Sequence, residues 1–180
     1  MKRILFFVFL LLASTSVFAQ RNLIYTFDGL QLSVPSTYTV TRTQDGGLNI
    51  QDAYGDYEME TSAVLASTLN SLVNSLIDDL GSSYRLNTDD YFSYLPGLLY
   101  EVGKDEPGYS SFSLIEKRSS QKWALLDYSC YNRKKYSYVK GRIYTVRYGA
   151  YVVMFSMEYP YDGSVNTLQR IANTLKLASY

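Results

Sequence analysis

Residues 65–81 read LASTLNSLVNSLIDDLG and carry the strongest periodic pattern in the chain. Their apolar residues recur at the 3.6-residue period of an α-helix and therefore form one stripe along it. Gly81 follows the last apolar residue, at the position where helices commonly end. Serine and asparagine occupy the opposite face, which favours a core contact over a membrane face or a groove for a partner helix. The stripe consists of Leu65, Leu69, Leu72, Val73, Leu76, Ile77 and Leu80.

The segments on both sides of this helix favour β-strands. Two turn signals, Asp28-Gly29 and Asp45-Gly46-Gly47, separate short alternating segments near the N-terminus, because glycine accepts the positive φ of a hairpin turn. Beyond Asp90, the β-branched and aromatic residues that pleated surfaces favour become frequent. We expect strands over residues 23–27, 30–34, 38–43, 48–52, 97–104, 111–117, 122–131, 138–147 and 151–159.

The end of the chain completes the expected architecture. Residues 151–155 are apolar at every position, which is typical of a central strand covered on both faces. A second amphipathic helix follows, with an apolar stripe of Val165, Leu168, Ile171, Ala172 and Leu175. The predicted fold class is α+β, a mostly antiparallel sheet flanked by two amphipathic helices, in a single domain over residues 20–180.

This order of elements resembles the PsbP-like, or Mog-type, α/β/α sandwich. Residues 27–35, FDGLQLSVP, match the opening strand of that family, in which alternating apolar residues run from a glycine to a proline. Residues 168–177, LQRIANTLKL, match its closing helix and short apolar tail. The resemblance implies a non-catalytic role, because known members are mostly extrinsic subunits, partner-binding factors or envelope proteins. No site motif of the family is recognisable here, so the resemblance assigns no functional residue.

The first twenty residues have the pattern of a secretory signal peptide. Lys2 and Arg3 precede a short apolar run, and Val17 and Ala19 suit the −3 and −1 positions of a cleavage site. The run is shorter than the roughly 20 residues of a membrane span. No cysteine follows it directly, and the one cysteine of the chain is Cys130, so the run does not match a lipoprotein signal. We expect cleavage after Ala19, a mature chain without a transmembrane segment, and a periplasmic or secreted location in a Gram-negative bacterium.

The composition excludes several kinds of catalytic and metal site. The chain has no histidine and one cysteine, which excludes Ser-His-Asp triads, Cys-His dyads and histidine-ligated zinc. Removing residues 1–19 takes away two of the 17 basic side chains and none of the 17 acidic ones, leaving a net charge of −2. That balance argues against a nucleic-acid partner, which usually meets an excess of positive charge. We expect no cofactor, no metal and no enzymatic activity.

Tyrosine is the most distinctive residue type, with 19 copies in the chain. Tyrosines crowd the last third, where they serve either as half-buried cross-strand packing or as a binding platform. A basic run, Arg133-Lys134-Lys135, lies between two tyrosine-rich strands and forms either a solvated turn or a contact surface. The candidate binding residues are Tyr131, Arg133, Lys134, Lys135, Tyr136 and Tyr138.

Other candidate sites have weaker patterns. Asp78-Asp79 and Asp89-Asp90 are paired acids, but neither pair lies in an EF-hand pattern for calcium. Serines lie near Lys117 and Lys122 without the spacing of a Ser-Lys hydrolase. Strand alternation places Cys130 on an apolar face, which predicts a buried thiol rather than a cross-link.

These observations support one main hypothesis and two alternatives. The main hypothesis is an exported, non-catalytic protein that binds another envelope protein. The first alternative is a glycan-binding or glycan-cleaving module, which requires a groove with aromatic rings and two facing acids. The second is a carrier of a small hydrophobic ligand, which requires an enclosed apolar cavity.

Overall fold

The computed structural model describes residues 21–81 and 90–178. A three-stranded sheet contains, in spatial order, β1 (Asn22–Phe27), β2 (Leu30–Pro35) and β10 (Lys176–Leu177). A seven-stranded antiparallel sheet contains, in spatial order, β3 (Thr39–Arg42), β4 (Leu48–Gln51), β5 (Glu58–Leu65), β9 (Tyr151–Pro160), β8 (Ser137–Tyr148), β7 (Trp123–Asn132) and β6 (Tyr109–Ser119). The helices are α2 (Leu69–Leu80), α3 (Tyr91–Gly103) and α4 (Asn166–Ala172), with a 3-10 turn η1 (Ala66–Thr68) before α2.

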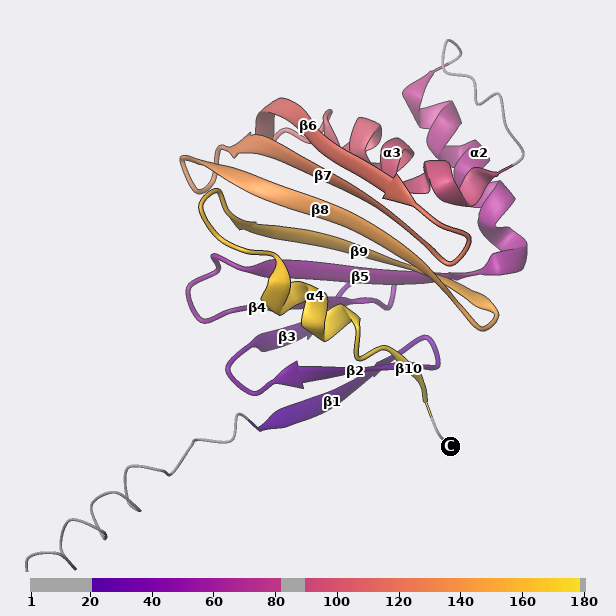
Figure 1. The fold of residues 1–180 in the computed structure, drawn as a ribbon, viewed down its shortest axis with the longest axis horizontal. Helices are drawn as coiled ribbons and strands as arrows, with labels where there is room; N and C mark the ends of the chain where they lie inside the picture. The colour runs from indigo at the N-terminus through magenta and orange to yellow at the C-terminus, as the bar shows by residue number, and fades with distance from the viewer. Residues whose placement is uncertain (1–20, 82–89, 179–180) are drawn as a thin grey trace, which may run out of the picture.

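The large sheet is covered on both faces, which confirms the α+β fold class. In Figure 1, α4 crosses in front of the sheet while α2 and α3 lie behind it. The front layer also includes β1 and β2, whose apolar residues join α4 in one core. The back layer packs α2 and α3 against the opposite face of β7 and β9 in a second core.

Strand β9 belongs to both cores, as the apolar run at residues 151–155 predicts. Val153 and Phe155 face α4 and the small sheet, whereas Val152 and Met154 face α2 and α3. All four are buried. Because successive side chains of a strand point to opposite faces, a strand with a layer on each side needs apolar residues at every position.

Most of the predicted local structure is confirmed. Asp28 and Gly29 have positive φ in the β1–β2 turn, and Gly46 has a φ of 92° in the β3–β4 turn. Cys130 is buried on the α3 side of β7, as alternation predicts. The C-terminal stripe is buried at Leu168, Ile171, Ala172 and Leu175. The predicted signal peptide lies outside the described residues.

The first helix is shorter than its apolar pattern suggests. Helix α2 begins at Leu69, and Leu65 ends strand β5 with an exposed side chain. Leu69 and Val73 are buried, and the rest of the stripe within the helix packs against the same core. Gly81 ends the helix with positive φ, as expected. None of the helices within residues 21–81 and 90–178 is long and apolar enough to cross a membrane.

The strand predicted for residues 97–104 is wrong. These residues form the second half of α3 and the turn after it. The helix contains Pro96, which cannot donate a backbone hydrogen bond and usually interrupts helices. The helix forms nonetheless because Phe92, Leu95 and Leu98 are fully buried against the sheet, so tertiary packing outweighs local preference.

Strand β5 is absent from the prediction, although it pairs with β9 along its whole length. Its side chains alternate between a face of Met59, Thr61 and Ala63 and a face that begins with Glu58 and Glu60. The first face joins the front core, in which Met59 is buried. The second face is polar, so the segment lacks the apolar content expected of a strand in the middle of a sheet.

A buried ion pair connects the large sheet to α4. Asp127 of β7 lies opposite Arg142 of β8, and the guanidinium donates to both carboxylate oxygens at 2.6 and 2.7 Å. Another guanidinium nitrogen donates to Gln169 of α4 at 3.1 Å. The side chains of Asp127 and Arg142 are only 11% and 13% exposed. Removing one charge therefore leaves the other buried without compensation.

We predict that Asp127→Asn lowers the free energy of unfolding by about 3 kcal/mol, because Arg142 then stays buried without a counter-charge. Urea denaturation of the variant and the parent protein measures this difference. The matched control is Glu101→Gln, which breaks the exposed pair with Lys104 and is expected to cost less than about 1 kcal/mol. Equal losses in the two variants would contradict the structural role of the buried pair.

Candidate functional site

The β7–β8 hairpin brings most of the candidate binding residues together. Tyr131 and Tyr138 are cross-strand partners, with ring centroids 5.3 Å apart in an edge-to-face arrangement. Tyr161, which the prediction omits, lies 6.4 Å from Tyr138 in the same row of rings. The exposed fractions are 83% for Tyr136, 54% for Tyr138 and 49% for Tyr161. These four tyrosines and the turn at residues 133–135 are called the tyrosine tip below.

Asn132 holds the turn of the tyrosine tip. Its side-chain oxygen accepts hydrogen bonds from the backbone amides of Lys134 and Lys135 at 2.9 and 3.1 Å. Tyr136 has a φ of 51°, a left-handed conformation that completes the turn. The amide of Arg133 donates to the carbonyl of Gly108 at 2.9 Å. The exposed rings are therefore presented by an ordered backbone.

The three basic residues of the tip do not form one cationic patch. Arg133 and Lys134 are exposed, whereas the ammonium of Lys135 lies 2.7 Å from Glu158 of β9. A hollow of about 230 Å³ lies beside Tyr138 and Tyr161 and includes Asp56 and Asp162. The surface around the tyrosine rings is therefore mixed in charge.

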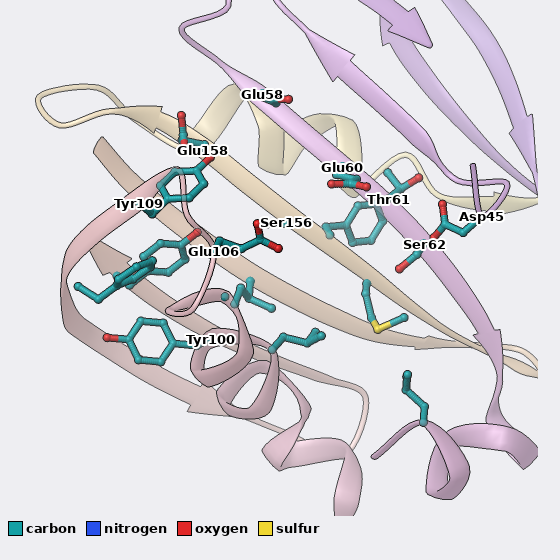
Figure 2. Close-up of a pocket in the computed structure, with 18 residues that line it drawn as sticks. Asp45, Glu58, Glu60, Thr61, Ser62, Tyr100, Glu106, Tyr109, Ser156 and Glu158 are labelled. Atoms are coloured by element: carbon teal, nitrogen blue, oxygen red, sulfur yellow. The ribbon is translucent and has the colours of Figure 1, made fainter. Parts of the chain in front are cut away.

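A larger groove lies on the back face of the sheet, where sequence analysis placed no site. It has a volume of about 550 Å³ and runs over β5, β9 and β8 toward the C-terminal end of α3. Figure 2 shows its acidic and aromatic side chains. Its polar lining residues are Asp45, Glu58, Glu60, Thr61, Ser62, Glu106, Ser156 and Glu158. Its remaining lining residues are Leu72, Leu99, Tyr100, Gly103, Tyr109, Phe112, Tyr128, Ile143, Met154 and Phe155.

The polar face of β5 forms part of the groove floor. Glu58 lies directly opposite Glu158, and Glu60 lies opposite Ser156, in the antiparallel β5–β9 pair. Glu106 approaches from the loop after α3 (Figure 2). Asp45 lies in the β3–β4 turn that sequence analysis identified only as a hairpin. The groove therefore gathers acids from four segments that are distant in the sequence.

Glu158 is the best compensated of these acids. It is 8% exposed and accepts a hydrogen bond from the side chain of Asn132 at 2.9 Å. It also pairs with Lys135 and accepts a hydrogen bond from the phenol of Tyr109. Burial, followed by the charge and hydrogen bond of Glu158, raises the pKa of Tyr109. Glu158 thus connects the groove to the base of the tyrosine tip.

Aromatic rings form the wall of the groove next to α3. Tyr100 lies 5.8 Å from Phe112 and 5.5 Å from Tyr128, measured between ring centroids. The ring of Tyr128 lies across β8 at Gly141, where an added Cβ would approach it to 2.2 Å. Glycine at position 141 is therefore required for this ring position. Burial raises the pKa of Tyr128 and, to about 12, that of Cys130 beside it on β7.

The groove bears on the two alternative hypotheses. It combines aromatic rings with acids, which is the geometry that the glycan alternative requires. Its acids Asp45, Glu60 and Glu106 are exposed, so its lining differs from the enclosed apolar cavity that a hydrophobe carrier requires.

The paired acids of the sequence do not form a metal site within the described residues. Asp78 and Asp79 are exposed in the last turn of α2, and Asp89 lies outside the described residues. Within residues 21–81 and 90–178, no three acids or cysteines are grouped closely enough to hold a metal ion.

Glu60 is the acid whose surroundings oppose its charge most directly. Its pKa is raised from the ordinary value of 4.5, first by burial and then by the charges of Asp45, Glu58 and Glu106. A carboxyl group whose pKa is higher in the folded state stabilises the fold fully at pH below its unfolded pKa. That contribution disappears as the pH rises through the folded pKa. At neutral pH, the ionised Glu60 therefore opposes folding.

We predict that Glu60→Gln raises the melting temperature at pH 7, and that the gain disappears at about pH 4. The side chain is more than a third exposed, so solvent screening keeps the gain to about 1–2 °C. Thermal unfolding followed by circular dichroism at both pH values measures it. Asp105→Asn, an exposed acid outside the groove beside Lys104, is the control and should give no gain. A gain of the same size at pH 4 would refute the electrostatic explanation.

Comparison with known proteins reveals similarity in fold. No family model matches the chain, and no curated protein matches its sequence. A crystal structure from Bacteroides thetaiotaomicron VPI-5482 is similar with a TM-score of 0.50 and 13% identity, covering 89% of this chain. This chain spans about half of that protein, 49% of its length. The solution structure of cyanobacterial PsbP (CyanoP) from Synechocystis sp. PCC 6803 is similar with a TM-score of 0.51 and 10% identity, covering 91% of this chain and 96% of that one. The fold is therefore PsbP-like.

Proposed function

We propose that this chain is an exported, non-catalytic protein that binds another protein of the cell envelope through the tyrosine tip. The observation that carries the proposal is the exposure of three tyrosines at this tip, Tyr138 and Tyr161 in ring contact with each other and Tyr136 in the adjoining turn. Tyrosine combines a large apolar face with a hydroxyl group and loses little conformational entropy on binding, so it is enriched where protein interfaces gain most of their affinity.

The ordered conformation of the tyrosine tip supports this role. The cross-strand contact between Tyr131 and Tyr138 and the hydrogen bonds of Asn132 hold the rings before any partner arrives. Lys140 lies over the ring of Tyr161, with its ammonium 4.7 Å from the ring centroid. A surface that is already ordered pays less entropy when it binds a partner.

Two sequence features support export and the absence of catalysis. Residues 1–19 contain basic residues, then an apolar run, then small residues, which is the order found in a secretory signal. The proposed partner is therefore an envelope protein. A chain without histidine lacks the most frequent general acid–base residue of enzymes. The PsbP-like fold agrees with this proposal only at the level of architecture.

The test is photo-crosslinking in living cells of the source bacterium. A photoreactive benzoyl-phenylalanine replaces Tyr136 in one strain and Tyr94 in a control strain, where Tyr94 is an exposed tyrosine on α3. We expect one dominant protein adduct from position 136 and none from position 94. The substitution Tyr138→Ala, introduced beside the probe at position 136, should reduce the adduct about tenfold, as the loss of a central interface tyrosine does.

Two outcomes would contradict the proposal. One is an equal yield of adducts from positions 94 and 136, which would indicate non-specific collision. The other is the absence of any protein adduct at position 136 while the protein itself accumulates normally. Mass spectrometry of the purified adducts identifies the partner and distinguishes a second copy of this chain from a different protein.

A further inference from the structure

The back-face groove has a strong excess of negative charge. Five of its 18 lining residues are acids, and none of the 18 is lysine or arginine. Lys135, which pairs with Glu158, lies outside this lining. Acids that lie close together on the same side of a groove repel one another unless a cation joins them.

The pairing of β5 with β9 places acids opposite each other on the groove face of the sheet. Glu58 lies directly opposite Glu158, and because Lys135 compensates Glu158, the repulsion that remains is among Glu58, Glu60 and the neighbouring acids. Asn49 donates a hydrogen bond to Glu58 at 3.0 Å, but an amide brings no positive charge. The charged groups that act on Glu60 are all acids. A cation bound in the groove would relieve this repulsion.

The opposite side of the groove suits an apolar group. Phe112 packs against the rings of Tyr100, Tyr109 and Tyr128, with centroids 5.8, 6.3 and 5.9 Å away. Leu99 and Ile143 complete this wall. Aromatic faces attract organic cations as well as apolar stems. The volume of about 550 Å³ is within the range of small-ligand sites, roughly 300–1,000 Å³.

We propose that the back-face groove binds an organic cation, an ammonium or guanidinium group carried on an apolar stem. The positive group lies among Glu58, Glu60 and Glu106, and the stem lies against the ring of Phe112. This site is separate from the tyrosine tip, and the inference goes beyond the proposed function. A neutral sugar would stack on the rings but leave the acids uncompensated, so the charge of the groove favours a cation over a glycan.

The test measures binding of a matched ligand pair to the full chain, purified as the source cell produces it. 2-Phenylethylamine and 2-phenylethanol share a ring and a stem and differ in charge at neutral pH. Isothermal titration calorimetry should give at least about tenfold tighter binding for the amine, as expected for a charge-assisted hydrogen bond. Agmatine and the blocked peptide acetyl-Gly-Arg-Gly-amide then distinguish a free amine from an arginine side chain of a protein, and tighter binding of either supports the proposal.

Variants test whether the amine binds in the groove or elsewhere on the surface. The double substitution E58Q/E60Q keeps the side-chain shapes and should weaken amine binding about tenfold or more. The exposed control D105N should leave binding unchanged. Y136A should also leave it unchanged, so a failure of the proposed function does not affect this test. Circular dichroism confirms that each variant is folded.

Three results would overturn the inference. The first is equal affinity for 2-phenylethylamine and 2-phenylethanol. The second is amine binding that E58Q/E60Q leaves unchanged, which would place the cation elsewhere. The third is binding of a neutral oligosaccharide such as cellobiose in preference to every amine, which would assign the groove to a glycan.

Discussion

The burial of β9 on both faces is the constraint on which the rest of the structure depends. Val153 and Phe155 hold the front layer of α4 and the small sheet, while Val152 and Met154 hold α2 and α3. Each layer would expose a large apolar surface without this strand, so neither core is complete alone. β9 also pairs with β5 and β8 along its length, which joins the N-terminal and C-terminal halves of the chain.

The same strand leads directly to the groove. Beyond Met154, the residues of β9 that face α3 are Ser156 and Glu158, and β5 places Glu60 and Glu58 opposite them. Helix α3 covers the neighbouring strands but leaves this strip as a groove. Apolar residues at these positions would extend the back core and stabilise the sheet. The charges of Glu58 and Glu60 at two of these positions are a local cost of the kind that proteins accept at binding sites.

Local patterns predicted the parts of the fold whose signals are local. The glycine turns at residues 29 and 46, the continuous apolar strand and the α2 stripe each follow from neighbouring residues. Residues 131–138 of the tyrosine tip could also be grouped from the sequence, because one hairpin brings them together, whereas Tyr161 follows β9 and joins them only through the fold. Strand β5 was missed because its polar face lines the groove rather than a core. Helix α3 was missed because Pro96 and Gly97 have low helix propensity, whereas the helix is stabilised by long-range packing that the local sequence does not show. The groove itself joins residues from 45 to 158, which no local pattern can bring together.

Native-state hydrogen exchange by NMR tests the central role of β9 most directly. We predict that the backbone amides from Val152 to Glu158 exchange only through global unfolding, so that their opening free energies equal the stability of the whole domain. The groove floor at Ser156 and Glu158 is then preformed, since it belongs to the most stable strand. Exchange of these amides through local opening, at free energies well below those of the small sheet or α2, would contradict the central role of β9.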